Sequence, residues 1–153
     1  INLSLVKSVI KSNQKRSLLL LNKVNELLKG KIKNKNICFL GVTFKANTDD
    51  MRDSSTLVMI PSLAKKGARI NYYDPTGEKN YFKKIKNVNF SKDIKSAIYN
   101  SDLVIIHTEW NDFKSINFKS LIKKKSFIIY DMRNIYSPSK MKKAKIKYFG
   151  IGR

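Results

Sequence analysis

The residues best suited to chemistry are charged side chains that follow an apolar run. The run Ile-Cys-Phe-Leu at residues 37–40 leads into a glycine and then into residues 41–54, which hold Lys45, Arg52 and three aspartates. A glycine between an apolar run and a helix-like segment marks the point where a strand gives way to a helix. In open α/β sheets, ligands bind outside the carboxyl ends of the strands. We therefore predict that residues 41–54 contact an anionic ligand such as a nucleotide.

Two further polar clusters follow apolar runs in the same way. Glu109 and Trp110 come after residues 103–107, and residues 131–134 (Asp-Met-Arg-Asn) come after residues 127–130. Clusters at the carboxyl ends of parallel strands meet at one edge of a sheet, so they predict a single site. A guanidinium grips phosphate oxygens with two parallel hydrogen bonds, which an ammonium cannot do. The two arginines in these clusters, Arg52 and Arg133, are therefore better candidates than any lysine except Lys45.

The pattern of apolar segments predicts the fold class. Strands and helices alternate along the chain, which predicts an α/β fold with a doubly wound, mostly parallel, Rossmann-like sheet preceded by a long α-helix. Ser54 or Ser55 is expected to cap the first helix after the sheet begins, and Pro61 is expected to kink that helix or shift its start. We expect strands at residues 37–44, 69–73, 88–90, 103–107, 127–130 and 147–150, and helices at 1–29, 56–66, 93–99 and 118–124.

The first helix is longer than a small domain needs. At 1.5 Å per residue it would extend about 40 Å, so it is expected to connect two domains or to form a dimer interface, although it could be an ordinary packing helix. The chain begins inside this helix without a methionine, so we expect it to be part of a longer protein. Asp74, after the second strand, could hold a ribose hydroxyl or could simply begin the turn before Pro75.

Composition narrows the functional classes. The net charge of +21 would suit nucleic-acid binding, but the charge is carried mainly by lysines spread over every segment and only five residues are arginine. Clustered arginines and aromatic residues, which specific nucleic-acid binding requires, are missing. No apolar run approaches the ~20 residues of a membrane span. The single cysteine, Cys38, fits a reducing compartment, and acting as a nucleophile would require a histidine partner and exposure.

Four motifs, in this order, resemble the UDP-glucose/GDP-mannose dehydrogenase family. The first is residues 44–54 (Phe-Lys-Ala-Asn-Thr-Asp-Asp-Met-Arg-Asp-Ser), and Tyr-Asp-Pro at 73–75, Thr-Glu-Trp at 108–110 and Asp-Met-Arg-Asn at 131–134 follow. The end of the chain, Gly-Ile-Gly-Arg at 150–153, is most similar to the UDP-glucose 6-dehydrogenase branch. Together the motifs are specific, and the resemblance runs from about Val9 to the last residue.

The resemblance implies a division of the chain and roles for named residues. Residues 1–30 would be the end of a central helix used for homodimer formation, and residues 31–153 would be the C-terminal domain that binds the UDP-sugar substrate. Phe44, Lys45 and Arg133 match substrate contacts, and Arg52 matches a contact to NAD bound by another domain. An Asn-Gln pair on the helix, Asn13 and Gln14, is interpreted as structural. Met132 stands where relatives commonly have glycine.

The family oxidises an alcohol of the sugar twice with two NAD, through a thioester on a cysteine. That cysteine segment and the Gly-rich cofactor loop are not in this sequence, so we expect no catalytic residue and no metal site here, and no activity from this chain alone. The family also implies a cytoplasmic protein of nucleotide-sugar metabolism and polysaccharide biosynthesis, with no membrane or specific nucleic-acid partner. UDP-N-acetylmannosamine or GDP-mannose are alternative substrates, and a stand-alone nucleotide-binding module without catalysis is an alternative function.

Overall fold

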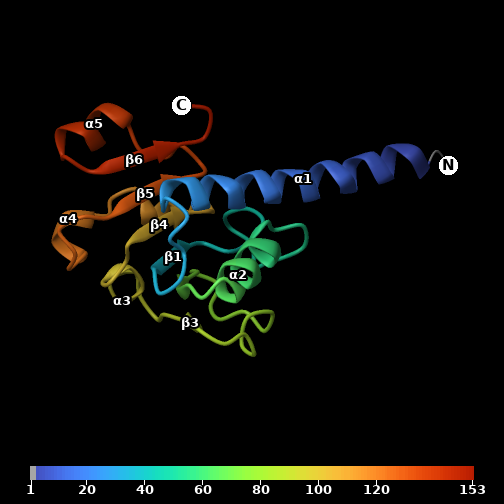
Figure 1. Cartoon of the computed structure of the whole chain (residues 1–153), viewed down its shortest axis with the longest axis horizontal. Coiled ribbons are helices and arrows are strands. Elements are labelled where there is room, and N and C mark those ends of the chain that lie inside the picture. Colours follow the sequence, from blue (N-terminus) through green and yellow to red (C-terminus); the bar gives the residue numbers. More distant parts are fainter. Residues whose placement is uncertain (1–2) are drawn as a thin grey trace.

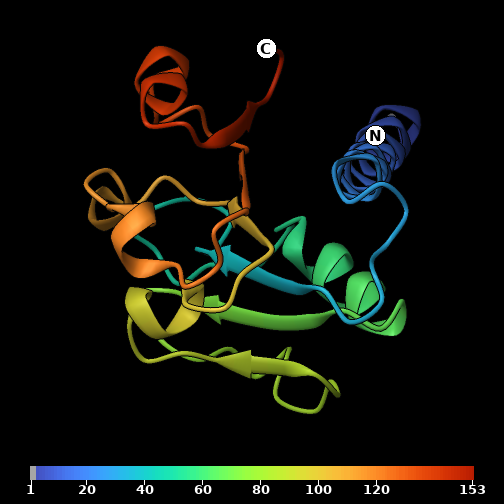
Figure 2. The same cartoon turned by 60° about the vertical axis from the view of Figure 1, so that its left-hand side comes forward.

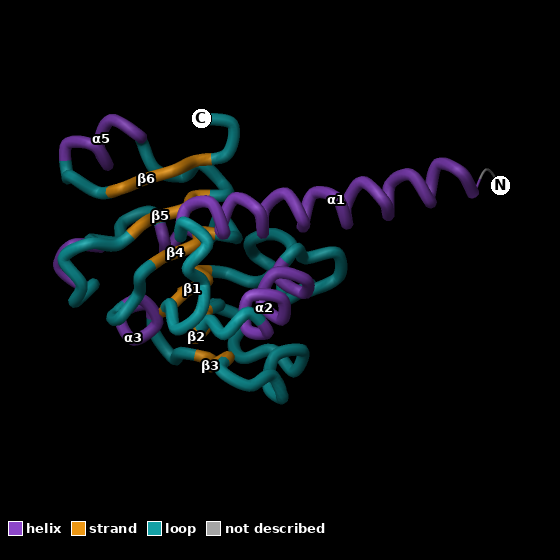
Figure 3. The backbone as a smooth tube through the Cα atoms, viewed as in Figure 1, coloured by secondary structure: helices purple, strands orange, loops and turns teal. Residues whose placement is uncertain are grey.

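Six short strands form one parallel sheet in the computed structural model, which describes residues 3–153 (Figures 1 and 3). The strand order is β3-β2-β1-β4-β5-β6, and each neighbouring pair is parallel. The direction of winding therefore reverses between β1 and β4, which is where doubly wound sheets open a ligand-binding crevice. The strands are β1 (Asn36–Leu40), β2 (Arg69–Tyr73), β3 (Val88–Phe90), β4 (Leu103–Ile106), β5 (Ile128–Asp131) and β6 (Lys147–Gly150).

The central strands are apolar on both faces because helices cover both. In β1, Ile37 and Phe39 belong to one core, and Cys38 and Leu40 belong to the other. The first core lies under α1 (Leu3–Leu27) and α2 (Thr56–Lys65). The second lies under α3 (Ile94–Ile98), the 3-10 helix η1 (Asn111–Phe113), α4 (Phe118–Leu121) and α5 (Pro138–Lys143). Figure 2 shows this three-layer arrangement, with α1 seen nearly end-on beside α2.

Helix α1 is only partly packed on the domain. Its last turns bury Leu20, Leu21 and Val24 against the first core. Its first half extends beyond the rest of the molecule (Figure 1), and Val6 and Val9 there are more than half exposed. The helix that the sequence predicted is therefore confirmed over its described residues, and residues 1–2 lie outside them.

The predicted fold class is confirmed, and the deviations are local. Strand β1 ends at Leu40 instead of reaching Phe44, because Gly41 turns the chain with a φ of +76°. Helix α2 begins at Thr56 and continues through Pro61 to Lys65. Residues 122–124 are not helical, and α5 was not predicted from the sequence. The described part of the chain holds no helix long and apolar enough to cross a membrane.

Candidate functional site

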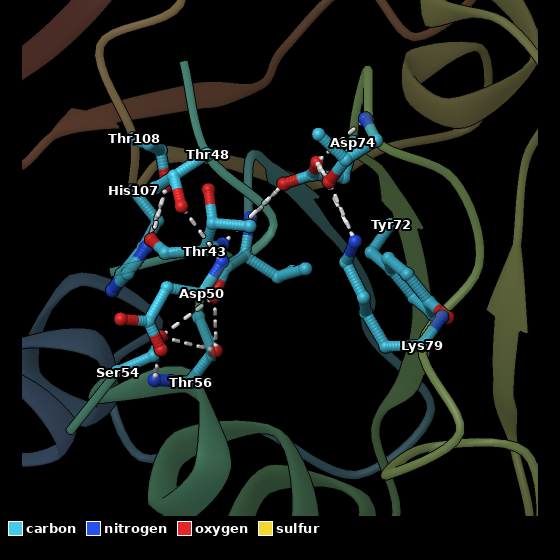
Figure 4. A network of polar contacts seen from close by, with 12 residues as sticks. Thr43, Thr48, Asp50, Ser54, Thr56, Tyr72, Asp74, Lys79, His107 and Thr108 are labelled. Atoms are coloured by element: carbon cyan, nitrogen blue, oxygen red, sulfur yellow. Dashed lines mark hydrogen bonds and ion pairs between the residues drawn. The ribbon is translucent and has the colours of Figure 1, made fainter. Parts of the chain in front are cut away.

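The loop after β1 is held against the end of β4. The Thr108 hydroxyl donates a hydrogen bond to the Thr43 carbonyl oxygen at 2.8 Å. Gly41 permits this close approach, because a Cβ atom there would lie 2.5 Å from the Cβ of Thr108. At the far end of the loop, the hydroxyls of Ser54 and Thr56 both donate to the Val42 carbonyl oxygen, at 2.6 and 2.8 Å. The loop is therefore tied down at both ends (Figure 4).

The buried carboxylate of Asp74 holds the same loop from the other side. Its Oδ2 accepts hydrogen bonds from the backbone N–H groups of Val42 at 2.8 Å and Thr43 at 3.3 Å. Its Oδ1 accepts from the N–H and the hydroxyl of Thr76, and the Lys79 ammonium lies 3.9 Å away (Figure 4). These contacts favour the turn interpretation of Asp74 over the ribose-binding one, because both carboxylate oxygens are already engaged inside the protein.

Of the two predicted helix caps, Ser54 makes a capping hydrogen bond and Ser55 does not. Ser55 precedes α2 but makes no capping hydrogen bond with its side chain. The Ser54 hydroxyl instead accepts a long hydrogen bond of 3.4 Å from the Thr56 N–H. The Ser55 hydroxyl points across to β4, where it lies 2.8 Å from Nε2 of His107. The Ser55 side chain therefore does not cap α2 but contacts His107 at the end of β4.

Arg133 is positioned by the turn that follows β5. The buried carboxylate of Asp131 accepts hydrogen bonds from the Arg133 N–H at 3.0 Å, the Tyr136 N–H at 3.1 Å and the Tyr148 hydroxyl at 2.8 Å. The side-chain amide of Asn134 pairs with both backbone groups of Ile151, at 3.0 and 3.1 Å. The last residues of the chain therefore brace the turn that carries Arg133.

The Arg133 guanidinium reaches from β5 to the ends of β4 and β1. Its Nε donates to the His107 carbonyl oxygen at 2.6 Å, and its terminal nitrogen donates to the Phe44 carbonyl oxygen at 3.2 Å. A guanidinium has five N–H groups, so three remain available to a ligand. Glu109 lies 3.1 Å from Nε as an ion pair. One side chain thereby joins all three polar clusters that the sequence placed at this edge of the sheet.

A cavity of about 500 Å³ lies between α1, the loop after β1 and the ends of β4 and β5. Its volume falls within the range of small-molecule sites. Three cations and one carboxylate line it, which favours an anionic ligand. The residues that line it are Ile10, Asn13, Gln14, Arg16, Ser17, Leu20, Phe44, Lys45, Asp53, Ser54, Ser55, Leu57, Val58, His107, Met132 and Arg133.

Three of the four predicted site residues meet in this cavity. Phe44, Lys45 and Arg133 line it, and Phe44 is 47% exposed, so its ring is open to a ligand. Arg52 does not line it. The Arg52 side chain is 85% exposed and pairs with Asp50 through two hydrogen bonds, at 3.0 and 3.1 Å. Its guanidinium lowers the pKa of the Asp50 carboxyl.

Three polar residues that line the cavity were not identified from the sequence at all. Arg16 and Ser17 come from α1, and His107 comes from the end of β4. Asn13, Gln14 and Arg16 share the cavity-facing side of α1, so the Asn-Gln pair interpreted as structural lies at the site. His107 could have been found from the sequence, because it directly follows the apolar residues 103–106. It was instead assigned to the predicted strand 103–107, and the polar cluster after that strand was taken to begin at Glu109.

His107 is held neutral by its surroundings. It is buried, and burial together with the positive charges of Arg133 and Arg16 lowers its pKa to about 3. Because the imidazole is uncharged, the positive charge of the cavity comes from Arg16, Arg133 and Lys45. The cavity is therefore lined by three cations together with neutral hydrogen-bonding groups, an arrangement that suits an anionic ligand.

A larger and more open hollow of about 990 Å³ lies over the other face of the sheet. It is lined by α3 and α4 residues and by two carboxylates, Asp93 and Asp112, with Lys95 as its one cation. Asp93 already caps α3 by accepting from the Ser96 N–H at 2.7 Å. Because two carboxylates against one cation oppose anion binding, the smaller cavity is the better candidate.

Comparisons with known proteins identify the family of the chain. Residues 38–138 match the UDP binding domain of the UDP-glucose/GDP-mannose dehydrogenase family. The chain is similar to the UDP-glucose 6-dehydrogenase of Rickettsia conorii, with 37% identity over 155 residues that cover 99% of this chain and 36% of the relative. It is also similar to the enzyme of that name from Rhizobium meliloti, with 37% identity over 97% of this chain and 34% of the relative.

A solved structure shares the fold. A UDP-glucose dehydrogenase from Pyrobaculum islandicum superposes with a TM-score of 0.71 over 97% of this chain and 32% of its own, at 23% identity. The chain thus spans about a third of the length of the curated relatives it matches.

Proposed function

Because this chain belongs to the UDP-glucose/GDP-mannose dehydrogenase family, we propose that it is the UDP-sugar-binding part of an NAD-dependent UDP-glucose 6-dehydrogenase. In this proposal residues 1–30 are the end of the central helix, and residues 31–153 form the substrate-binding domain. The observation that carries it is the cavity in which Arg133, Lys45 and Arg16 gather at the carboxyl edge of the sheet. Such preorganised cations suit the diphosphate of a nucleotide sugar.

We propose that Phe44, Lys45 and Arg133 contact the substrate. Arg133 has three free N–H groups for phosphate oxygens, and Lys45 is an exposed cation that lines the same cavity. Phe44 offers an exposed ring against which a sugar or base can pack. Arg133 donates a hydrogen bond to the carbonyl oxygen of Phe44, which directly precedes Lys45 in the sequence. This bond fixes the position of the loop that carries Phe44 and Lys45 relative to Arg133.

The residues of this chain do not fit an NAD site of their own. In dinucleotide folds, the backbone N–H groups after the first strand bind the pyrophosphate. Here the N–H groups of Val42 and Thr43 are taken by the Asp74 carboxylate. We propose instead that Arg52, which projects into solvent beside Asp50, contacts NAD bound to another part of the full-length protein. NAD would supply the hydride acceptor for the oxidation.

The test is a pair of measurements. Calorimetric titration of this chain should detect binding of UDP and UDP-glucose, and the full-length protein should produce two NADH per UDP-glucose. NADH production with UDP-N-acetylmannosamine or GDP-mannose would keep the family and change the substrate. Binding of UDP without NADH production by a full-length protein that has the cofactor loop and the cysteine would favour a nucleotide-binding module, and failure to bind UDP would refute the proposal.

A nucleic-acid-binding role makes a different prediction. A specific nucleic-acid-binding protein should stay bound to DNA at ~200 mM salt. If the net charge of +21 is only a surface coat of lysines, binding to DNA should be lost as salt approaches that concentration. We propose a cytoplasmic location, which a single free and buried cysteine supports because it suits a reducing compartment.

We further propose that α1 mediates a homodimer. Leu5, Val6, Val9, Leu18 and Leu19 on this helix are each more than half exposed, an apolar surface that a monomer would leave in water. Light scattering at micromolar concentration should give the mass of a dimer, and the double variant Val6→Asp/Val9→Asp should be monomeric. Tyr81→Asp, at a residue that is 60% exposed on the loop after β2, is the control and should stay dimeric. A monomeric wild-type chain would exclude this interface.

A further inference from the structure

Four groups form a chain of hydrogen bonds across the point where the strand order reverses. The Thr108 hydroxyl donates to the Thr43 carbonyl oxygen at 2.8 Å. The same hydroxyl oxygen lies 3.0 Å from Nδ1 of His107, and Nε2 of His107 lies 2.8 Å from the Ser55 hydroxyl. Three of these residues are buried, and only Ser55 is partly open to the cavity (Figure 4 shows the buried part). This series of hydrogen bonds thus ends at the cavity, at Ser55.

The direction of every bond follows from counting protons. A hydroxyl has one proton, and that of Thr108 is used by the Thr43 carbonyl oxygen. Nδ1 of His107 must therefore carry a hydrogen in order to bond to the Thr108 oxygen. A neutral imidazole has only one N–H, so Nε2 is the acceptor and Ser55 donates its proton to it.

The surroundings keep the ring in this neutral form. Arg133 bonds to the His107 carbonyl oxygen, and Arg16 faces it from α1, while Lys45 lies on the loop above. No carboxylate among the described residues hydrogen-bonds to the ring, although Asp53 lines the same cavity. Burial and the two arginines place the pKa of His107 at about 3, so the ring stays uncharged at working pH.

We propose that Ser55 is a specificity-determining residue that presents only acceptor lone pairs to the cavity and receives a hydrogen bond from a hydroxyl of the bound nucleotide sugar. This inference rests on the proposed function. A serine whose proton is committed to His107 cannot donate to a phosphate oxygen, so the phosphates are left to Arg133, Arg16 and Lys45. The cavity thereby separates recognition of charge from recognition of hydroxyl groups.

The same pair could be a serine nucleophile with its base, but the structure does not favour that chemistry. An effective general base has a pKa near the working pH, and His107 is far below it. Its Nδ1 bonds to a hydroxyl rather than to a carboxylate that would stabilise a charged ring. Ser55 therefore binds rather than attacks.

The test compares three ligands on two variants. Ser55→Ala should weaken binding of UDP-glucose about tenfold and leave inorganic pyrophosphate unchanged. An equal loss with UDP places the hydroxyl on the ribose, and an unchanged affinity for UDP places it on the hexose. His107→Phe removes the acceptor of the Ser55 proton, so Ser55 can then donate to a phosphate oxygen. Pyrophosphate should therefore bind more tightly, and the preference for UDP-glucose over pyrophosphate should fall. Loss of pyrophosphate binding in Ser55→Ala would overturn the inference, since it would mean that Ser55 donates to phosphate.

A second measurement does not depend on any variant folding. His107 is the single histidine of the chain, so its ring nitrogens can be assigned directly by ¹⁵N NMR. The expected spectrum has a protonated Nδ1 and an unprotonated Nε2, unchanged from about pH 6 to about pH 8. A protonated Nε2 would refute the inference. If the wild-type chain binds UDP-glucose and Ser55→Ala binds it equally well, the inference falls while the proposed function stands, whereas no binding by the wild type refutes the proposed function itself.

Discussion

Replacing Arg133 with alanine is expected to weaken the binding of UDP to this chain about 50-fold, the cost of losing a charge-assisted, two-pronged contact to phosphate. The loss should be large because Arg133 acts twice. It offers free N–H groups to the ligand, and it ties the Phe44 and His107 carbonyl oxygens into one rim. Calorimetric titration with UDP measures the effect, and thermal unfolding of the same samples separates lost binding from lost folding.

Two matched variants sharpen the measurement. Arg133→Lys keeps the charge but lacks the planar fork that spans two carbonyl oxygens and the phosphate, so we expect about a tenfold loss. Arg69→Ala removes the same charge from an exposed position at the amino end of β2, away from the cavity, and should leave the affinity for UDP unchanged. If Arg133→Ala binds UDP as tightly as the wild type, Arg133 has no role in the site.

The parts of the site that the sequence predicted are those governed by strand order alone. A parallel sheet brings the carboxyl ends of its strands to one edge, so residues directly after apolar runs had to meet there. Lys45 and Arg133 were predictable for this reason, and Phe44 from its motif. The fold class followed from the same alternation of strands and helices, whereas the short helix α5, with three lysines among its six residues and only Met141 buried, lacks an apolar periodicity to reveal it.

The parts that it could not predict depend on how separate elements dock. Arg16 reaches the cavity only because the last turns of α1 pack on the first core, and helical spacing alone does not say which polar face looks inward. The Ser55–His107 contact spans 52 residues and depends on the close approach of the β1 and β4 ends that Gly41 permits. Ser55 was predicted, as the alternative to Ser54, to cap a helix, because local capping rules take no account of a buried acceptor across the sheet.

Measurements of stability can decide whether Asp74 holds a ribose hydroxyl or has a structural role in its turn. Its side chain is fully buried, and it satisfies the N–H groups of Val42, Thr43 and Thr76 at 2.8, 3.3 and 3.0 Å. A removed carboxylate would leave these donors unpaired in the interior and the nearby Lys79 ammonium without a counter-charge. A residue held only for a ribose hydroxyl would instead be replaceable at no cost to the unliganded fold.

Asp74→Ala is therefore expected to lower the free energy of unfolding by about 3–5 kcal/mol, the range for breaking a buried, hydrogen-bonded charge. Asp74→Asn should cost less, because its one carbonyl oxygen can still accept from one pair of donors. Asp112→Ala, at an exposed carboxylate of η1, is the control and should change stability by less than about 0.5 kcal/mol. Urea unfolding followed by circular dichroism measures all three. Unchanged stability of Asp74→Ala, together with lost affinity for UDP, would instead assign Asp74 to the ribose.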